Sequence, residues 1–487
     1  MGLITPEEYK KSLKDGRVVY YEGEKVEDVT THQALKVCVE TAALDYQMAE
    51  MPEYKDLATV KLPKTGELIS RYYYTPQNAE DLMKRHELMV AATRLGGSVI
   101  PFIHDIGADT LNAVNITAKM MGKKKYMERA ENYRYYLQKN DLSAASAVTD
   151  VKGDRMERPS SSKQTHPDYY VRVVDKDDKG ITVRGAKAHI TASAYTKELF
   201  VIPCRNMTEE DKDYAVAFAI PVNTKGIKQI CHPITWKLGA LEFPVDLPIR
   251  NHTDSLIVFD DVFVPWDRVF LCGEYQYAIA LVYHFAYLHR HTAASYRIPV
   301  SEAMLGAAQA MAEYNGIDKI PHIREKITNL IIYVDTLKSL ARASCMDFVT
   351  HEGIPIPNPV ISNIAKYHFA ENVHNCIKAI EDIAGGLLIT VPTYKDFQNP
   401  ETKGYIDKYL GGKKGISTEA RLRMMQLIRR RLATFETEVL ALHAEGSLQA
   451  QRMTIYAERM AEVQKYKGWV EIAAGIKKYV YCWSMQF

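Results

Sequence analysis

The spacing of apolar and polar positions divides the chain into two helical ends and a strand-rich middle. Residues 76–97 and 125–140 carry apolar side chains at helical spacing, and the first stretch ends in a pair of glycines. After residue 140 the pattern changes to short β-branched and apolar runs between turn residues, over 169–175, 180–193, 198–204, 214–222 and 255–265. We therefore expect an N-terminal α-helical domain over residues 1–140 and a β-rich middle domain over residues 141–275.

Beyond residue 275 the pattern predicts long helices again. Residues 321–348 place apolar side chains three or four positions apart, at Ile323, Ile327, Leu330, Val334, Leu337 and Ala341. This spacing is typical of a helix that is buried along one stripe. We expect such helices to pack into a C-terminal helical bundle over residues 276–487. Residues 157–169, rich in serine, proline and other polar residues, are expected to form a surface loop.

Charge and hydropathy narrow the classes of partner. The 487 residues include 62 lysines and arginines and 60 aspartates and glutamates, so no net field favours nucleic acid or an anionic membrane. No apolar run reaches the roughly 18 residues that a membrane span needs. We expect neither nucleic-acid nor membrane partners.

Cysteine usage and the N-terminal residues indicate a compartment. The seven cysteines are scattered without a CxxC pair, which suits reduced thiols and gives no zinc pattern. Thr5, Pro6 and Glu8 follow the order of a helix capping box instead of a signal sequence. Both observations predict a cytoplasmic protein.

The chain lacks the familiar motifs of nucleotide, zinc-protease and hydrolase sites, which are GxGxxG after a strand, GxxxxGK[ST], HExxH and GxSxG. A large cofactor would have to be bound in another way. One candidate is VTDVKGDR, residues 148–155, because its glycine lets backbone amides approach a ligand and its side chains offer donors to an anionic or carbonyl-rich partner. The candidate cofactor-binding residues are Thr149, Lys152, Gly153, Asp154 and Arg155, and the alternative is an ordinary polar turn.

A second candidate lies in the predicted strand 184–193. The period-two alternation of a strand would place Lys187, His189 and Thr191 on one face. Three polar groups on one face need water, partners or a ligand, so Lys187 and Thr191 join the cofactor candidates.

Two predicted helix ends are weaker candidates. Residues 381–386 end a helix in Gly385 and Gly386, where a cap needs one glycine, and the second is consistent with close approach of a phosphate or another chain. Ser447 stands at a helix N-cap position and is followed by Gln449. A helix N-terminus of this kind either holds a pyrophosphate or only caps itself.

The stretch HRHTAASYR, residues 289–297, concentrates reactive side chains in a predicted helix. His289 and His291 are two positions apart, hence roughly 200° apart around a helix, and cannot share a metal ion. Tyr296 shares the face of His289, whereas Arg290 and Arg297 share another. The pattern predicts one histidine and one tyrosine on a common face, with partners from elsewhere in the chain, and no metal motif.

Six motifs together resemble a known superfamily: VTDVKGDR, RGAKAHITASA, DDVFVPWDRVFLC, YHFAYLHRH, EDIAGGL and GSLQAQR. In this order they are similar to segments of the superfamily that joins 4-hydroxyphenylacetate 3-hydroxylase with 4-hydroxybutyryl-CoA dehydratase/vinylacetyl-CoA isomerase, and they are closer to the dehydratase branch. The resemblance implies an α+β fold like that of acyl-CoA dehydrogenases, with an N-terminal α domain, a middle β-barrel domain and a C-terminal helical bundle. It also implies FAD between the β domain and the bundle, a homotetramer or homodimer, and a flavin site that a neighbouring subunit completes at Gly385 and Gly386.

The chain departs from the dehydratase branch at its iron-sulphur site. By motif matching, the cluster histidine falls on His289, but the three cysteine positions fall on Pro101, Asp105 and Tyr296. Because an iron-sulphur cluster needs thiolates, we expect no cluster.

The residues left at the former cluster position have three interpretations. Asp105, His289 and Tyr296 could form an acid–base set, in which the carboxylate orients the imidazole and the phenol donates a proton. They could instead hold a mononuclear metal, or fill the pocket as ordinary hydrogen-bonded side chains. Arg297 and Ala293 stand where that branch has a lysine and a tyrosine of its site, so Arg297 joins the catalytic candidates.

The hydroxylase branch is changed as well. Its phenol-binding arginine and tyrosine would fall near Ile106 and Thr110, and its histidine near Ser146. A phenolate needs cationic or hydrogen-bonding groups, so their loss argues against the usual phenol chemistry. His104 and Asp109 are close in sequence and could do equivalent work.

We therefore expect an FAD-dependent oxidoreductase or isomerase without an iron-sulphur cluster. It would act at the α and β carbons of a small acyl-CoA ester, with His289 moving the proton. One alternative is a reduced-flavin-dependent monooxygenase that hydroxylates a phenol such as 4-hydroxyphenylacetate and needs a partner flavin reductase. The other is a flavin-binding subunit without catalytic activity.

Overall fold

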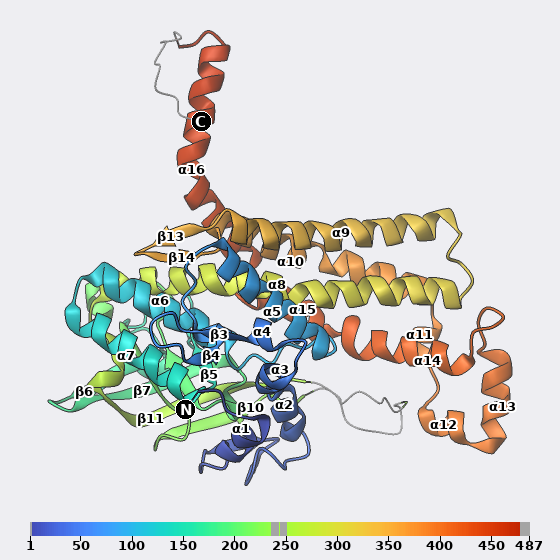
Figure 1. Ribbon diagram of the computed structural model, residues 1–487, viewed down its shortest axis with the longest axis horizontal. Helices are drawn as coiled ribbons and strands as arrows, with labels where there is room; N and C mark the ends of the chain where they lie inside the picture. Colours follow the sequence, from blue (N-terminus) through green and yellow to red (C-terminus); the bar gives the residue numbers. More distant parts are fainter. Residues whose placement is uncertain (1, 235–242, 244–250, 478–487) are drawn as a thin grey trace.

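The computed structural model describes residues 2–234, 243 and 251–477, and it places two β-sheets beside a long helical bundle (Figure 1). The chain begins with helices that pack near the sheets. They are α1 (Pro6–Ser12), α2 (Leu35–Ala42), α3 (Leu44–Glu50), α4 (Lys55–Ala58), α5 (Ala79–Leu95), α6 (Asp105–Met121) and α7 (Lys124–Asn140). A small hairpin of β3 (Thr59–Lys61) and β4 (Leu68–Ser70) separates α4 from α5.

Capping side chains fix where these helices begin. The Thr5 hydroxyl accepts a hydrogen bond from the Glu8 amide at 3.1 Å, and the Glu8 carboxylate accepts one from the Thr5 amide at 2.8 Å, which confirms the predicted capping box. In α5 the Asn78 side chain accepts from the Asp81 amide at 3.0 Å. The helix predicted over 76–97 is therefore confirmed, with its ends set by Asn78 and by the glycine pair after Leu95.

The middle of the chain forms two open sheets. The six-stranded sheet has the order β2 (Glu24–Lys25), β1 (Val19–Tyr21), β10 (Ile227–Cys231), β11 (Asp254–Pro265), β7 (Gly180–Thr191) and β6 (Arg172–Lys176). The four-stranded sheet has the order β12 (Val269–Cys272), β9 (Val216–Pro221), β8 (Glu198–Val201) and β5 (Ala144–Ala147). Each of the five predicted strand regions contains a strand.

The expectation of a β-barrel is wrong for this middle part. The two sheets face each other across a core of alternating inward side chains, which includes Val183, Phe218 and Phe259, and in the described residues they do not close into a barrel. β1 pairs in parallel with β10, with Val19 opposite Gln229, so the first helical region also contributes to the middle sheet. The domain boundaries at residues 140 and 275 stay predictions.

The bundle is built on three long helices, α8 (Ala278–Tyr314), α9 (Pro321–Met346) and α10 (Pro359–Ala384). A hairpin of β13 (Val349–His351) and β14 (Ile354–Ile356) joins α9 to α10. Five members of the predicted α9 stripe are buried, and Ile327 is half-buried. The mixed fold, with helices before and after the sheets, is therefore confirmed.

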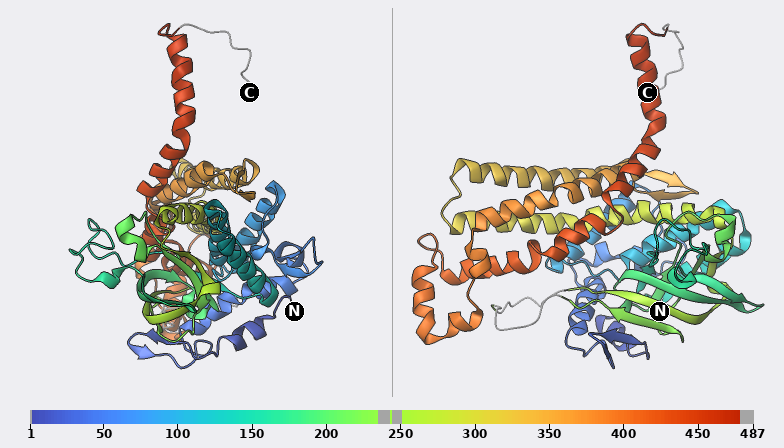
Figure 2. Two further views of the ribbon diagram at one scale, coloured as in Figure 1. Left: turned by 90° about the vertical axis from the view of Figure 1, so that its left-hand side faces the viewer. Right: turned by 180° about the vertical axis from the view of Figure 1, so that it is seen from behind.

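The chain ends in shorter helices and one that stands apart. They are α11 (Leu387–Thr390), α12 (Tyr394–Gln398), α13 (Pro400–Tyr409), α14 (Thr418–Leu427), a π-helix (Ile428–Leu432), α15 (Phe435–His443) and α16 (Leu448–Ala473). The outer part of α16 projects from the body in every view (Figures 1 and 2). It exposes large apolar residues, which include Tyr456, Val463, Tyr466, Trp469 and Val470. None of the described helices has the length and hydropathy to cross a bilayer.

The cysteines of the described residues agree with the prediction of reduced thiols. Cys204, Cys231, Cys272, Cys345 and Cys376 are free thiols, as expected of a chain whose cysteines have no paired spacing. Cys482 lies outside the described residues.

Gly107 sets how closely α6 lies against β5. A Cβ added there would lie 2.6 Å from the Ala144 Cβ and 2.7 Å from its carbonyl oxygen, whereas one added at Gly306 of α8 meets nothing within 4 Å. We expect Gly107→Ala to lower the thermal unfolding midpoint, because overpacking a close contact costs about 1–3 kcal/mol. Gly306→Ala is the matched control, since replacing an unhindered helical glycine is neutral or stabilising. A melt followed by circular dichroism that shows equal midpoints for both variants would contradict this packing.

Candidate functional site

The centre of the site is the buried carboxylate of Asp109, which joins three helices. Asp109 lies on α6 and accepts hydrogen bonds from Arg85 of α5 at 2.7 Å, and from His289 Nδ1 at 3.1 Å and Thr292 Oγ1 at 2.9 Å on α8. Burial raises the pKa of this carboxyl, but Arg85 and His289 outweigh burial and hold it below its ordinary value. Asp109 is therefore an ionised anchor.

The contact with Asp109 also fixes the chemistry of His289. Because an ionised carboxylate can only accept, His289 Nδ1 is the donor, and Nε2 is left as the atom that can exchange a proton with a ligand. The side chain keeps 12% of its surface exposed. Burial lowers the pKa of His289, but the hydrogen bond and charge of Asp109 raise it above its ordinary value overall.

Asp105 lies one turn before Asp109 on α6, and it differs from our expectation. We predicted that Asp105 would orient His289, but the structure assigns that contact to Asp109. Both carboxyl oxygens of Asp105 are buried, and neither has a hydrogen-bond partner among the described residues. Burial, helped by the charges of Asp45 and Asp109, raises the pKa of Asp105 to about 7.

Tyr296 and Arg297 meet a residue that the sequence did not point to, Glu445. The Tyr296 hydroxyl donates to one Glu445 oxygen, and Arg297 donates to the other at 2.7 Å. Lys366 of α10 lies 4.0 Å from the same carboxylate and donates to the Ala441 carbonyl at 2.8 Å. Burial lowers the pKa of Lys366 to about 7. The only sequence signal for Glu445 is an acidic residue beside a glycine at a helix start, and its backbone has a left-handed φ of +56°.

The other side chains of HRHTAASYR lie where the helical spacing predicts. Arg290 donates to the Glu445 carbonyl at 3.2 Å and to Asn363 at 2.7 Å, so Arg290 and Arg297 hold the same segment before α16. His291 Nδ1 lies 2.9 Å from the Ser344 hydroxyl, on a different face from His289. His291 therefore takes no part in the pair with Asp109.

The two main segments of cofactor candidates, residues 148–155 and 184–193, lie side by side. Asp150 pairs with Lys187 across a β-bridge, and the Ala188 amide donates to the Thr149 carbonyl at 2.8 Å. The Lys187 ammonium is fully used, by the Val148 carbonyl at 2.9 Å, the Ile202 carbonyl at 2.8 Å and Asp150 at 2.8 Å. An ammonium has three donors, so Lys187 fixes this segment and has none left for a ligand.

The face predicted for β7 is interrupted. His189 has a left-handed φ of +59° and is exposed, whereas Lys187 is buried, so the two side chains do not share a face. The change accompanies an irregularity in the pairing of β7 with β11, between Ser255 and Ile257. The simple alternation was wrong here, and Thr191 is left as a half-buried hydroxyl at the end of the strand.

The rest of VTDVKGDR is a partly exposed turn. Gly153 has a φ of +54°, and a Cβ there would lie 2.2 Å from the Tyr169 ring, so packing explains this glycine. Gln164 of the predicted surface loop donates to the Lys152 and Asp154 carbonyls at 3.2 and 2.9 Å. The turn is thus held against the loop by these hydrogen bonds. The Arg155 side chain is exposed to solvent.

Within one chain, the cofactor candidates at the two helix ends do not lie beside residues 148–155 and 184–193. Gly385 and Gly386 are exposed at the C-terminal end of α10, at the far end of the bundle from β5 and β7 (Figure 1). Ser447 caps α16 by accepting from the Ala450 amide at 3.4 Å, and Gln449 is exposed. The capping interpretation of Ser447 is confirmed, and a ligand role for these four residues stays a prediction.

The hydroxylase-branch positions form a small polar contact of their own. The Thr110 and Ser146 hydroxyls lie 2.5 Å apart, and Ser146 donates to the Ile106 carbonyl at 3.2 Å. These groups satisfy one another and carry no charge. No three His, Cys, Asp or Glu side chains are arranged to hold a metal ion in the part of the chain that the structure describes.

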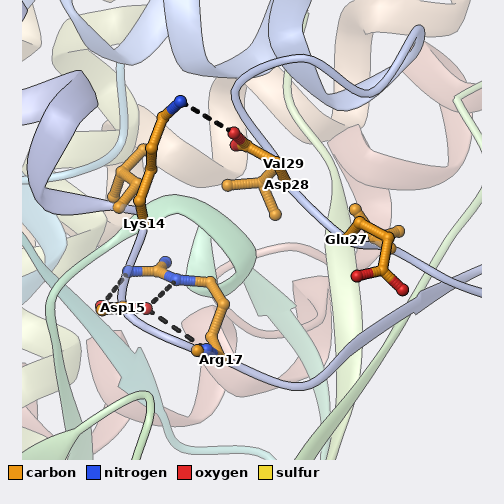
Figure 3. A pocket seen from close by; sticks show the side chains of 9 residues that line it. Lys14, Asp15, Arg17, Glu27, Asp28 and Val29 are labelled. Carbon is orange, nitrogen blue, oxygen red and sulfur yellow. Dashed lines mark hydrogen bonds and ion pairs between the residues drawn. The ribbon is translucent and has the colours of Figure 1, made fainter.

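A separate cavity of about 250 Å³ lies in the N-terminal segment, between residues 13–17 and 26–29. Figure 3 shows Lys14 paired with Asp28, at 3.1 Å, and Arg17 paired with Asp15, at 2.7 Å. None of the candidate site residues lines this cavity.

Family models match nearly the whole chain. The model described as 4-hydroxyphenylacetate 3-hydroxylase N terminal matches residues 5–271, and the one described as C terminal matches residues 278–474. The 4-hydroxybutyryl-CoA dehydratase/vinylacetyl-CoA-Delta-isomerase of Clostridium aminobutyricum is 33% identical, over 98% of this chain and 100% of its own. The 4-hydroxyphenylacetate 3-monooxygenase oxygenase component of Thermus thermophilus is 30% identical, over 84% of each chain.

Solved structures of both kinds are similar as well. An oxygen-tolerant archaeal 4-hydroxybutyryl-CoA dehydratase from N. maritimus has a TM-score of 0.89 and 29% identity, over 99% of this chain and 96% of that one. The oxygenase component of 4-hydroxyphenylacetate 3-monooxygenase complexed with FAD has a TM-score of 0.85 and 26% identity, over 97% and 99%. The resemblance inferred from six motifs is confirmed, and the chain belongs to the 4-hydroxyphenylacetate 3-hydroxylase family, whose relatives include the 4-hydroxybutyryl-CoA dehydratases.

Proposed function

We propose that the protein is an FAD-dependent enzyme that moves protons at the α and β carbons of a small acyl-CoA ester. One observation carries the proposal: His289 is held through Nδ1 by an ionised, buried Asp109, while the Asp105 carboxyl, one turn before Asp109 on α6, has no hydrogen-bond partner in the described chain. His289 on α8 can thus act as a base, and Asp105 on the neighbouring α6 can act as an acid. Relatives of both kinds, dehydratase and monooxygenase, support an enzyme of broadly oxidoreductase type.

The residues along β5 and β7 fit a flavin. Thr149 and Thr191 are half-buried, Arg155 is exposed, and no hydrogen bond within the described chain occupies these three side chains. Hydroxyl and guanidinium donors suit the carbonyl oxygens and the pyrophosphate of FAD. Solved structures of monooxygenase relatives are complexes with FAD, which supports the same cofactor here. When bound, FAD would supply the capacity to accept or return electrons.

Each residue of the site has a defined task under this proposal. His289 Nε2 takes a proton from the substrate carbon, and Asp109 keeps the ring in the tautomer that can do so. Arg85 and Thr292 hold Asp109 in place. The Tyr296–Arg297–Glu445 group lies close enough for Glu445 to raise the pKa of His289, so it adjusts the base and orients the substrate.

The phenol alternative is less well supported by the side chains. Ile106, Thr110 and Ser146 stand at the phenol-binding positions, and they offer no cation. The family relationship to monooxygenases keeps this alternative as an outcome of the tests below, together with its flavin reductase partner. An inactive flavin-binding subunit is the third outcome.

We also propose that two or more copies of the chain assemble, as a homodimer or homotetramer. The outer part of α16 exposes Trp469 at 70% and Tyr456 at 66%, more apolar surface than a lone helix leaves in water. Gly385 and Gly386 lie away from the other cofactor candidates, which suits a flavin site shared between chains.

FAD binding tests the cofactor assignment. Thr191→Val should weaken FAD binding by roughly 2- to 10-fold, because one hydrogen bond contributes about 0.5–1.5 kcal/mol. Thr182→Val, on the same strand, is the matched control and should bind as the unaltered protein does. A fluorescence titration with FAD measures both. If the protein takes up no FAD, the acyl-CoA and phenol proposals both fail.

Substrate addition separates the reaction classes. Under anoxia, acyl-CoA esters should bleach the flavin absorbance, and a phenol with reduced FAD should not accelerate oxygen uptake. The opposite pair of results would favour the monooxygenase, and the absence of both responses would favour the inactive subunit.

His289→Asn should lower turnover by about 10²- to 10⁴-fold while the flavin spectrum is unchanged. His189→Asn, at an exposed residue whose φ of +59° asparagine tolerates, is the control.

The pH profile tests the pair of His289 with Asp109. A base acts in its neutral form, so kcat/KM should rise as the pH passes upward through the pKa of His289, which Asp109 holds above its ordinary value. Asp109→Asn removes that charge, so the rise should move to lower pH, and the maximum should fall because the ring loses its anchor. Asp261→Asn, at an exposed surface pair with Arg184, should leave the profile unchanged. An unmoved profile in Asp109→Asn would remove this pair from the mechanism.

A further inference from the structure

A second histidine–aspartate group lies buried beside the site. His104, the N-cap residue of α6, has Nδ1 3.0 Å from Asp45 of α3 and Nε2 3.8 Å from Asp141, which follows α7. All three side chains are at most 4% exposed. The next residue along the chain is Asp105, so this group and the His289–Asp109 pair flank the same carboxyl.

The group and Asp105 share an unusual lack of partners. Buried polar atoms are normally hydrogen-bonded, and exceptions need an explanation. Seven such atoms without a partner among the described residues belong to this region: Asp45 Oδ1, the Tyr72 hydroxyl, Arg85 Nε, His104 Nε2, Asp105 Oδ1 and Oδ2, and Asp141 Oδ1. The buried pair of Lys187 with Asp150 is a contrasting case, because the Lys187 ammonium has all three of its donors in use. This concentration of unpartnered atoms sets the region apart and needs a physical explanation.

A count of charges shows where a proton must be. The groups that face Asp105 or His104 come from α3 (Asp45, Tyr46), the turn at 71–73 (Tyr72, Tyr73), α5 (Arg85), α6 (Asp109), the end of α7 (Asp141) and α8 (His289). Arg85 and His289 are already bound to Asp109. Among the described residues, His104 is the one side chain within ion-pair distance of Asp45 and Asp141 that can carry a positive charge. An ionised Asp105 would be a third carboxylate with no cation of its own, which a buried site does not tolerate.

We propose that Asp45, His104 and Asp141 are positioning residues of this site, and that their surplus negative charge keeps Asp105 in its protonated form as a proton store opposite His289. The pKa values agree in direction, since burial and Asp45 raise that of Asp105 to about 7. Burial also raises the pKa values of Asp45 and Asp141.

The catalytic use of this proton rests on the proposed function. In an isomerisation, the substrate gives one proton to His289 Nε2 and takes one from the Asp105 carboxyl at another carbon. The site is restored when the proton on His289 passes back to the Asp105 carboxylate, so no proton is gained or lost. The protonation of Asp105 itself needs neither flavin nor substrate.

Infrared difference spectroscopy of the full chain tests the proposal without any turnover. A buried carboxylic acid gives a carbonyl band that disappears as the acid ionises, and we expect such a band below neutral pH with a midpoint near the pKa of about 7 of Asp105. Asp105→Asn should remove it. Asp45→Asn keeps an acceptor for His104 but removes a negative charge. The Asp105 band of this variant is isolated by subtracting the spectrum of the double variant Asp45→Asn, Asp105→Asn. We expect its midpoint to lie roughly one pH unit lower than in the unaltered protein.

Two further variants complete the test. Asp15→Asn is the control, because Arg17 and Lys197 overcome the effect of burial and hold the pKa of Asp15 below its ordinary value, and it should leave the band unchanged. If Asp45→Asn does not fold, Asp141→Asn serves, since asparagine suits its φ of +45° and can still accept from the Ile4 amide. We expect a smaller shift in the same direction. A band that survives Asp105→Asn, or a midpoint that moves in neither variant, would overturn the proposal whether or not the protein binds FAD.

Discussion

The site depends on one buried carboxylate, that of Asp109. Taking a carboxylate out of water costs several kcal/mol, and only well-placed donors offset that cost. Arg85, His289 and Thr292 provide them, so α5, α6 and α8 are fixed relative to one another at this point. Two consequences follow from the same interaction. His289 must present Nε2 to any ligand. Within the part of the chain that the structure describes, Asp105 has no cation of its own, because Arg85 and His289, whose charges act on it, are already bound to Asp109.

A second buried carboxylate, Glu445, organises a further part of α8. Arg297 and Tyr296 bind its side chain, and Arg290 binds its carbonyl oxygen. Glu445 stands just before α16, the helix whose outer part is uncovered in a single chain. The candidate site is thus built partly from the segment that leads into the most exposed apolar surface of the molecule. This arrangement explains why α8 needs two arginines on one face, since both are used to hold that segment.

The order of the helices and strands could be predicted because it depends on the spacing of apolar, capping and glycine residues that are close in sequence. The stripe of α9, the cap at Asn78 and the glycine pair after Leu95 each act within a few residues. The pairing of β1 with β10, 210 residues apart at Val19 and Gln229, leaves no such local trace. For the same reason His289 and Tyr296 could be placed on one face, but their partners Asp109 and Glu445 could not be chosen. The face of β7 was mispredicted because a left-handed residue, His189, interrupts the alternation.

Asp105, His289 and Tyr296, which motif matching places at the cluster position of the dehydratase branch, do not share a hydrogen-bond partner in the described chain, and this favours the proposed acid–base use over a metal. A metal ligand must have a lone pair free, but the Tyr296 hydroxyl donates to Glu445 and accepts from Arg297 at 3.0 Å. His289 offers one nitrogen, and Asp105 offers oxygens that hold a proton near neutral pH. A cation there would have to displace that proton and break the Tyr296–Glu445 contact to gain a third ligand. The proton exchange that we propose between Asp105 and His289 requires neither change.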